Sequence, residues 1–149
     1  RVQRELELRG YASKVMVMPA STHTSAAAAA AIGCEVGQIA KSLVFRAQRS
    51  GDPILVVASG PNRVSTERLA QLLYEPITLA DPEFVRQHTG FKVGGVPPLA
   101  HPEPMVTLVD EDLLRHQTIW AAAGTPYAVF SLTPAQLVEM TGGRVCRIT

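Results

Sequence analysis

A short stretch rich in glycine and proline is the most unusual feature of this sequence. It reads Gly94-Gly95-Val96-Pro97-Pro98 and is soon followed by His101. Glycine permits positive φ and close approach of the backbone to other groups, whereas proline fixes φ and removes an N–H donor. Such a loop is contorted and stiff, so its glycine N–H groups could face a ligand. A tight connection between a helix and a strand would use the same residues, and the pattern alone leaves both interpretations open.

A lysine inside a predicted strand is the second candidate for chemistry. Residues 39–45 are rich in β-branched and aromatic side chains, and strand alternation places Lys41 on one face with Leu43 and Phe45. A lysine that shares a face with apolar groups either extends its amine to solvent at the strand end or reaches into a cleft. The pattern does not separate these two interpretations.

The elements that must position these residues predict an α/β fold. Apolar runs and alternation indicate about six or seven strands, and capping residues followed by proline or by apolar spacing indicate four or five helices. We expect a single domain, residues 1–149, with a mixed, curled, barrel-like β-sheet of about six or seven strands surrounded by helices. Residues 1–10 are expected to form a peripheral N-terminal segment. The predicted strands are 14–18, 39–45, 53–58, 105–109, 118–123, 127–132 and 145–148, and the predicted helices are 1–9, 26–32, 66–72, 82–88 and 134–140.

Composition and missing motifs exclude several classes of function. A net charge of +1 gives no strong field toward a nucleic-acid backbone, and Cys34 and Cys146 have no ligand spacing for zinc. No dinucleotide, Walker, zinc-protease or serine-hydrolase motif occurs, so we predict no cofactor and no metal. The longest uncharged apolar run, residues 26–34, is too short for a bilayer, and we expect a cytoplasmic protein without a membrane partner.

Five segments of the chain follow one another in a characteristic order: Ile39–Phe45, Gly94–Pro98, Val109–Leu114, Ile119–Gly124 and Leu132–Leu137. In this order they resemble the YbaK-type trans-editing family, whose members are freestanding relatives of the editing domain inserted in bacterial prolyl-tRNA synthetase. The resemblance begins near Lys14 and implies the YbaK-like fold. It implies an aminoacyl-tRNA deacylase that hydrolyses the ester between a wrongly attached amino acid and the 3′-terminal adenosine of tRNA.

The resemblance also implies roles for the two features above. The functional lysine of the family corresponds to Lys41, and the glycine-rich wall of its pocket corresponds to residues 94–98. An ammonium group at Lys41 could then hold the phosphate or carbonyl side of the substrate, and N–H groups near Gly94 and Gly95 could stabilise an oxyanion or orient water. Family members are implied to use the ribose hydroxyl of the substrate and a bound water rather than a protein nucleophile. We therefore predict that the Lys41 amine and these amides open on one cavity.

Other polar residues stand at the ends of predicted elements. Thr24 could cap the alanine-rich helix or face the pocket, and Asp110 could bind the amino group of the substrate or cap the following turn. His101 could contact the substrate or lie on a surface turn. Arg63 could contact an RNA phosphate or be solvated.

The substrate stays open at this stage. The cysteinyl-tRNA deacylases of the family differ from this chain in residues 21–31, so their specificity is not carried over, and a small amino acid such as Ala, Ser, Thr, Cys or Pro is expected. The implied partners are a mischarged tRNA and an aminoacyl-tRNA synthetase. The alternatives are a non-catalytic module that binds tRNA or a synthetase, and a small-molecule-binding protein with the same pocket.

Overall fold

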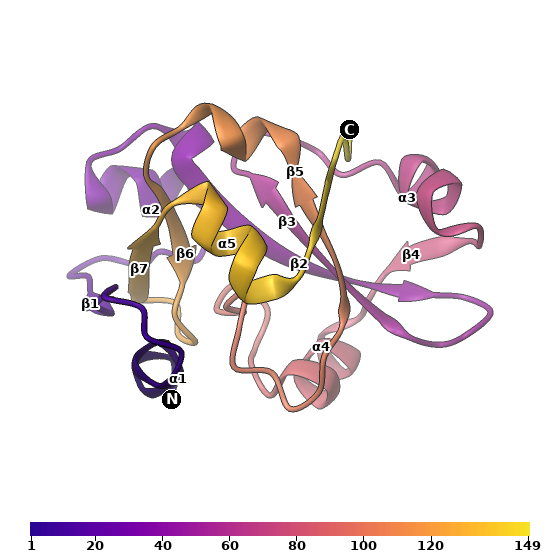
Figure 1. The fold of residues 1–149 in the computed structure, drawn as a ribbon, viewed down its shortest axis with the longest axis horizontal. Helices are drawn as coiled ribbons and strands as arrows, with labels where there is room; N and C mark the ends of the chain where they lie inside the picture. The colour runs from indigo at the N-terminus through magenta and orange to yellow at the C-terminus, as the bar shows by residue number, and fades with distance from the viewer.

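A single mixed β-sheet organises the fold of the computed structural model, which describes residues 1–149. The strand order is β1-β7-β6-β2-β3-β5-β8, with β4 paired to β2, and both parallel and antiparallel neighbours occur. Figure 1 shows β2 running across the molecule, with β6 and β7 toward one end and β4 toward the other. The strands are β1 (Met16–Val17), β2 (Ile39–Ala47), β3 (Pro53–Ser59), β4 (Ile77–Leu79), β5 (Val106–Asp110), β6 (Ile119–Ala122), β7 (Ala128–Leu132) and β8 (Arg144–Cys146).

Five α-helices and two short 3₁₀ helices connect these strands. Their starts follow the predicted capping chemistry: Asp81 and Thr133 accept hydrogen bonds from the first turn, and each is followed directly by a proline. No helix is long and apolar enough to cross a membrane. The helices are α1 (Val2–Leu8), α2 (Ser25–Ile32), α3 (Thr66–Leu73), α4 (Pro82–Thr89) and α5 (Pro134–Thr141), and the 3₁₀ helices are η1 (Val36–Gln38) and η2 (Glu111–Arg115).

Two hydrophobic cores lie on opposite faces of the sheet. On β3, Leu55 and Val57 belong to the larger core, whereas Val56 belongs to the smaller one. The same alternation in β2 puts Val44 in the larger core and Phe45 in the smaller, as a period of two requires. Burial of β3 on both faces explains its unbroken apolar sequence. The neighbouring strand β2 is positioned by its continuous pairing with β3.

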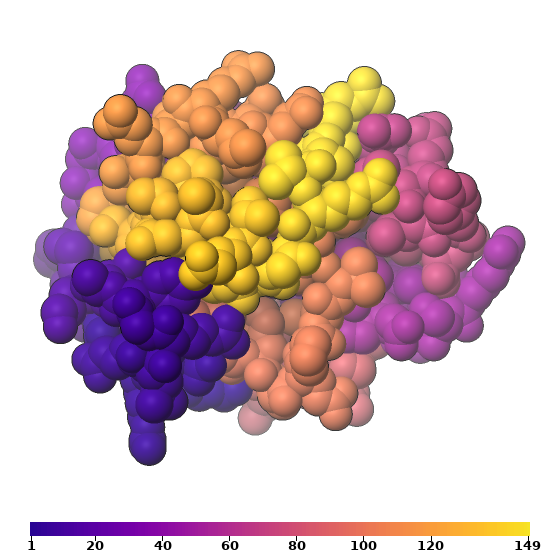
Figure 2. Space-filling view, in the orientation of Figure 1, coloured from indigo at the N-terminus to yellow at the C-terminus, as the bar shows by residue number.

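The N-terminal segment, predicted to be peripheral, contributes to the larger core. Val2 and Leu6 of α1 are buried there, since they share one face of the helix. Figure 2 shows this segment lying against the C-terminal part of the chain, and a hydrogen bond from Arg9 to the carbonyl of Met140 joins the two. Residues 1–10 are therefore anchored to the fold by buried side chains.

The α/β class and the mixed sheet are confirmed, but the number of strands differs from the prediction. The sheet has eight strands because β4, with three residues directly after Pro76, also pairs with β2. A strand this short carries too little alternation to be recognised in the sequence. Its pairing nevertheless matters, since it closes one end of the site described next.

Candidate functional site

One edge of β2 lacks a pairing strand along the middle of its length. Along one edge β2 pairs continuously with β3, but on the other edge β6 pairs only with Ile39 and Ala40. On that same edge β4 pairs only with the last three residues, from Phe45 onward. Residues 41–44 therefore have no neighbouring strand on this edge, which leaves a gap in the sheet between β6 and β4.

A cavity of about 530 Å³ fills this gap. Residues 40–44 of β2 run along it, residues 120–122 of β6 border it at one end, and the segment after β4 borders it at the other. Most of its lining is apolar, and Lys41 and His23 are its only basic side chains. The remaining lining residues are Thr22, Thr24, Ser25, Ala28, Ile39, Gly60, Leu79, Ala80, Pro82, Val85, Val93, Gly94, Val96 and Val129.

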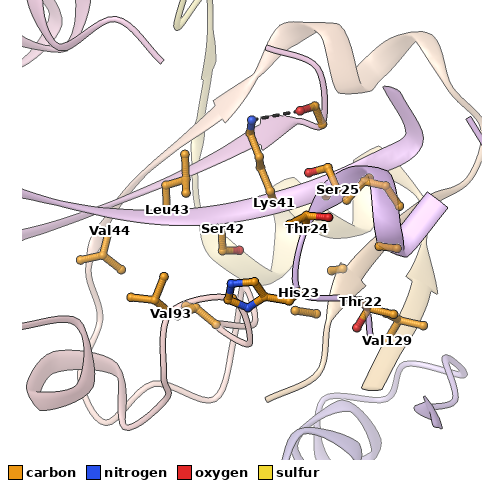
Figure 3. Close-up of a pocket in the computed structure, with 18 of the residues that line it drawn as sticks. Thr22, His23, Thr24, Ser25, Lys41, Ser42, Leu43, Val44, Val93 and Val129 are labelled. Carbon is orange, nitrogen blue, oxygen red and sulfur yellow. Dashed lines mark hydrogen bonds between the residues drawn. The ribbon is translucent and has the colours of Figure 1, made fainter. Parts of the chain in front are cut away.

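Lys41 extends its side chain from β2 to a bend in the chain just after β3. Its Nζ donates a hydrogen bond to the carbonyl oxygen of Gly60, at 3.0 Å (Figure 3). It donates a second one to the carbonyl oxygen of Asn62, at 2.7 Å. An ammonium group has three donors, so one N–H is left without a protein partner. Burial lowers the pKa of Lys41, the nearby carboxylate of Asp110 raises it, and the guanidinium of Arg63 lowers it. The amine is thus held in one place beside the cavity.

The other wall of the cavity is a close contact between His23 and Gly94. Gly94 has a φ of +89°, and a Cβ at this position would overlap the imidazole ring of His23. The backbone N–H of Gly94 donates no hydrogen bond within the protein. In Figure 3, His23 and Val93 lie on the side of β2 to which Ser42 points, whereas Lys41 points to the opposite side. The cavity therefore reaches both faces of the sheet through the gap.

Comparison with known proteins identifies the family to which this chain belongs. The profile of the aminoacyl-tRNA editing domain matches residues 19–140. The chain belongs to the aminoacyl-tRNA editing domain family. The matched residues run from before α2 to the last turn of α5, so they include every element that lines the cavity.

Two relatives in sequence and one in structure illustrate the editing family. YwhH of Bacillus subtilis is 38% identical over 84% of this chain and 79% of its own length. EbsC of Enterococcus faecalis, named as a candidate deacylase of Cys-tRNA(Pro) and Cys-tRNA(Cys), is 28% identical over 85% of this chain and 78% of its own. A crystal structure described as a candidate trans-editing enzyme for prolyl tRNA synthetase is 46% identical, with a TM-score of 0.93 over 99% of this chain and 94% of that one.

Asp110, expected either to bind the substrate or to cap the following turn, lies outside the cavity of this editing domain and caps the turn. The residue is 1% exposed and does not line the cavity. Its Oδ2 accepts hydrogen bonds from the Ser59 backbone N–H, at 2.9 Å, and the Asn62 side chain, at 2.8 Å, and its Oδ1 accepts one from the Asp112 N–H at 3.0 Å. Asp110 therefore stabilises the bend after β3, whose Gly60 and Asn62 carbonyls accept the hydrogen bonds of Lys41.

Other predicted residues divide between the cavity and its surroundings. Gly94, Val96 and Thr24 line the cavity, and Thr24 also caps α2 by accepting a hydrogen bond from Ala27. Gly95 does not line it, and its N–H donates a hydrogen bond to the carbonyl of Lys92. Outside the lining are also the buried Pro97 and Pro98 and the half-buried His101, whose Nε2 pairs with the carbonyl of Pro97 at 2.7 Å.

Beyond Lys41, the sequence interpretation missed the residues that β2 and the β4–α4 segment contribute to the site. Ser42 and Val44 line the cavity, together with Leu79 and Val85. Alternation in residues 39–45 predicts that Ser42 and Lys41 leave opposite faces of the strand. Nothing local to the sequence indicates that the strand lacks a partner there.

The charges around Lys41 predict opposite effects of two substitutions. We expect Asp110→Asn to lower the pKa of Lys41, because a stabilising negative charge is lost, and Arg63→Gln to raise it, because a positive charge is removed. The chain has three lysines, so a titration followed by the ¹³Cε signals resolves Lys41 directly. Glu111→Gln serves as the control, because it removes the carboxylate of the residue after Asp110. We expect it to leave the pKa of Lys41 unchanged. Shifts of equal sign in the first two variants would contradict the assigned electrostatics.

Proposed function

We propose that this protein hydrolyses the ester between a small amino acid and the 3′-terminal adenosine of a mischarged tRNA, acting in trans to a synthetase in the cytoplasm. The observation that carries the proposal is the cavity in the sheet gap, lined by Lys41 and Gly94 in a chain of the editing family. Its volume of about 530 Å³ lies in the range of small-ligand sites. The relative described as acting for prolyl tRNA synthetase supports a role beside a synthetase.

The groups around the cavity suit positioning chemistry better than covalent catalysis. None of the hydroxyl groups that line it is hydrogen-bonded to the His23 ring, so no serine or threonine has a base to activate it. The free donor of the Lys41 ammonium attracts the phosphate or carbonyl side of the substrate, and the unpaired N–H of Gly94 is available to an oxyanion or a water. An aminoacyl ester is intrinsically reactive, so holding it beside a water contributes much of the acceleration.

The lining also limits the amino acid. Val44, Val85 and Val93 offer apolar contacts, and no carboxylate is present to neutralise a basic side chain. A site of this kind favours small uncharged side chains and discriminates weakly between isosteres, because one methylene is worth only about 1–3 kcal/mol. Alanine, serine, threonine, cysteine and proline esters are the candidates.

A panel of mischarged tRNAs tests the proposal directly. Purified protein is mixed with tRNA carrying each of the five amino acids, and the loss of the ester is followed against the same tRNA in buffer. We expect at least one small aminoacyl-tRNA to be hydrolysed catalytically, with a shallow dependence on salt because the net charge is only +1. Binding of tRNA without hydrolysis of any ester would contradict the proposal and favour a non-catalytic module.

Gly94→Ala should lower deacylation about tenfold to a hundredfold, because its Cβ would displace His23 and move the wall of the cavity. The change also forces an alanine to a φ of +89°, which costs about 1 kcal/mol of stability. Gly51→Ala is the matched control, since Gly51 has a φ of +76° and open space around its Cβ position. We expect the control to lose similar stability but no activity. Equal activity in both variants would show that the wall is not part of the site.

A further inference from the structure

The α-ammonium group of an aminoacyl ester needs a hydrogen-bond acceptor, and the cavity offers it no carboxylate. No aspartate or glutamate lines the cavity. Asp110, the nearest candidate from the sequence, is buried and accepts hydrogen bonds from three protein groups. Burying a cationic ammonium group without a hydrogen-bond acceptor is costly, so a neutral oxygen, of a hydroxyl group or of the backbone, must serve.

The backbone of Ser42 points into the gap between β6 and β4. At that edge the carbonyl of Val44 accepts a hydrogen bond from the N–H of Ala80, at 3.1 Å. Peptide groups two residues apart in a strand point in the same direction, and the pairing of β2 with β3 is continuous through this region, so no bulge changes the direction. The N–H and the C=O of Ser42 therefore face the cavity.

No protein group occupies this backbone position. The ladder with β6 ends at Ala40, the ladder with β4 begins at Phe45, and Ser42 takes part in no hydrogen bond outside the ladders. Its Oγ is also the only buried side-chain polar atom in the protein without a hydrogen-bond partner. A strand edge that borders a cavity with an unpaired N–H and C=O is a ready template for one more extended residue.

We propose that Ser42 binds the aminoacyl group as a single residue of antiparallel strand. The Ser42 C=O accepts a hydrogen bond from the α-ammonium, and the Ser42 N–H donates one to the ester carbonyl. In a hydrogen-bonded antiparallel pair, each residue uses its own N–H and its own C=O, and an aminoacyl ester carries both groups on one residue. This inference rests on the proposed function and assigns the recognition of the reacting group to the backbone.

The pairing fixes where the amino-acid side chain lies. Directly opposed residues of an antiparallel pair place their side chains on the same face of the sheet. The side chain of an L-amino acid would thus share the face of Ser42 and Val44, where Val93 also lies (Figure 3). The Lys41 amine, on the other face, is left for the nucleotide side of the substrate. The N–H of Ser42 would also strengthen its bond as negative charge develops on the carbonyl oxygen.

Hydrogen exchange of individual backbone amides, followed by NMR on the full chain, tests the pairing. The probe is 3′-deoxy-3′-(L-alanylamino)adenosine, which an esterase cannot cleave. In the free protein we expect the Ser42 amide to exchange faster than the amides of Lys41 and Leu43, which face β3. The probe should protect Ser42 and leave the two neighbours unchanged. The propionyl counterpart lacks the α-ammonium and should bind about tenfold or more weakly, because a hydrogen bond to a charged group is lost.

The outcomes separate this inference from the proposed function. Protection of Ser42 by the alanyl probe supports the pairing even if no ester is hydrolysed. A Ser42 amide that is already protected in the free protein, or that the bound probe leaves unprotected, overturns the pairing even if deacylation is observed. Equal affinity for the alanyl and propionyl probes overturns it as well, because the α-ammonium would then have no acceptor.

Discussion

Lys41→Ala should lower deacylation of the preferred aminoacyl-tRNA by about a hundredfold to a thousandfold, in line with the loss of a preorganised electrostatic group. The amine is fixed by the carbonyls of Gly60 and Asn62, so no reorganisation is needed when substrate arrives. Truncation leaves the strand intact, because β2 keeps its whole ladder with β3. Single-turnover rates with saturating protein measure the loss, and the melting temperature should change little.

Two variants make this result specific. Lys14→Ala removes an exposed lysine outside the cavity and should keep full activity. Lys41→Arg keeps the charge but replaces a compact ammonium by a planar guanidinium, which cannot make the same two carbonyl contacts, so activity should recover only in part. Full activity in Lys41→Ala would remove this side chain from the mechanism.

Gly60→Ala should damage both stability and activity. A Cβ at this position would overlap the backbone carbonyl oxygen of Val36 and approach its Cγ1 to 2.9 Å and the Cβ of Ser25 to 3.0 Å. Backbone atoms cannot rotate away, so the bend after β3 must move. We expect a loss of about 1–3 kcal/mol in the free energy of unfolding, measured by urea denaturation. The displaced carbonyl of Gly60 should also release Lys41 and lower deacylation at least tenfold.

Gly37→Ala provides the comparison for Gly60→Ala. Gly37 also lacks a positive φ, but its Cβ would meet the Nε2 of His116 at 3.2 Å, which is the far end of a movable side chain. We expect a small change in stability and unchanged deacylation. Similar losses in the two variants would mean that any alanine in this region is harmful, and the specific role of the bend would be lost.

The fold was largely predictable because its strongest signals are local. The apolar run of β3 and the cap-then-proline starts of α4 and α5 each depend on a few consecutive residues. β4 was not predicted, since three residues cannot show a period and their pairing with β2 is a tertiary event. The buried contribution of α1 was missed for the same reason: Val2 and Leu6 are core residues only because the sheet lies beneath them.

The site was less predictable than the fold. Strand alternation placed Lys41 on a face with Leu43 and Phe45. Its contacts with the bend after β3, however, depend on the antiparallel pairing of β2 with β3, which is a tertiary contact. Asp110 follows a strand and precedes a turn, which fits both a ligand and a cap, and the sequence does not show the three hydrogen bonds that its carboxylate accepts in the fold. The gap beside Ser42 exists because β6 and β4 pair with the two ends of β2 and not with its middle. No single segment of the sequence predicts where these pairings stop.

One titration tests most directly whether the ester end of the substrate occupies the gap between β6 and β4. The alanylamino adenosine probe is added to protein labelled with ¹⁵N and with ¹³C in lysine, and the signals of the Lys41 Cε and the Gly94 amide are followed together. We predict that both move with one dissociation constant while His101, beside a separate cavity, stays unchanged. Shifts confined to the surroundings of His101, with Lys41 and Gly94 unmoved, would contradict this location.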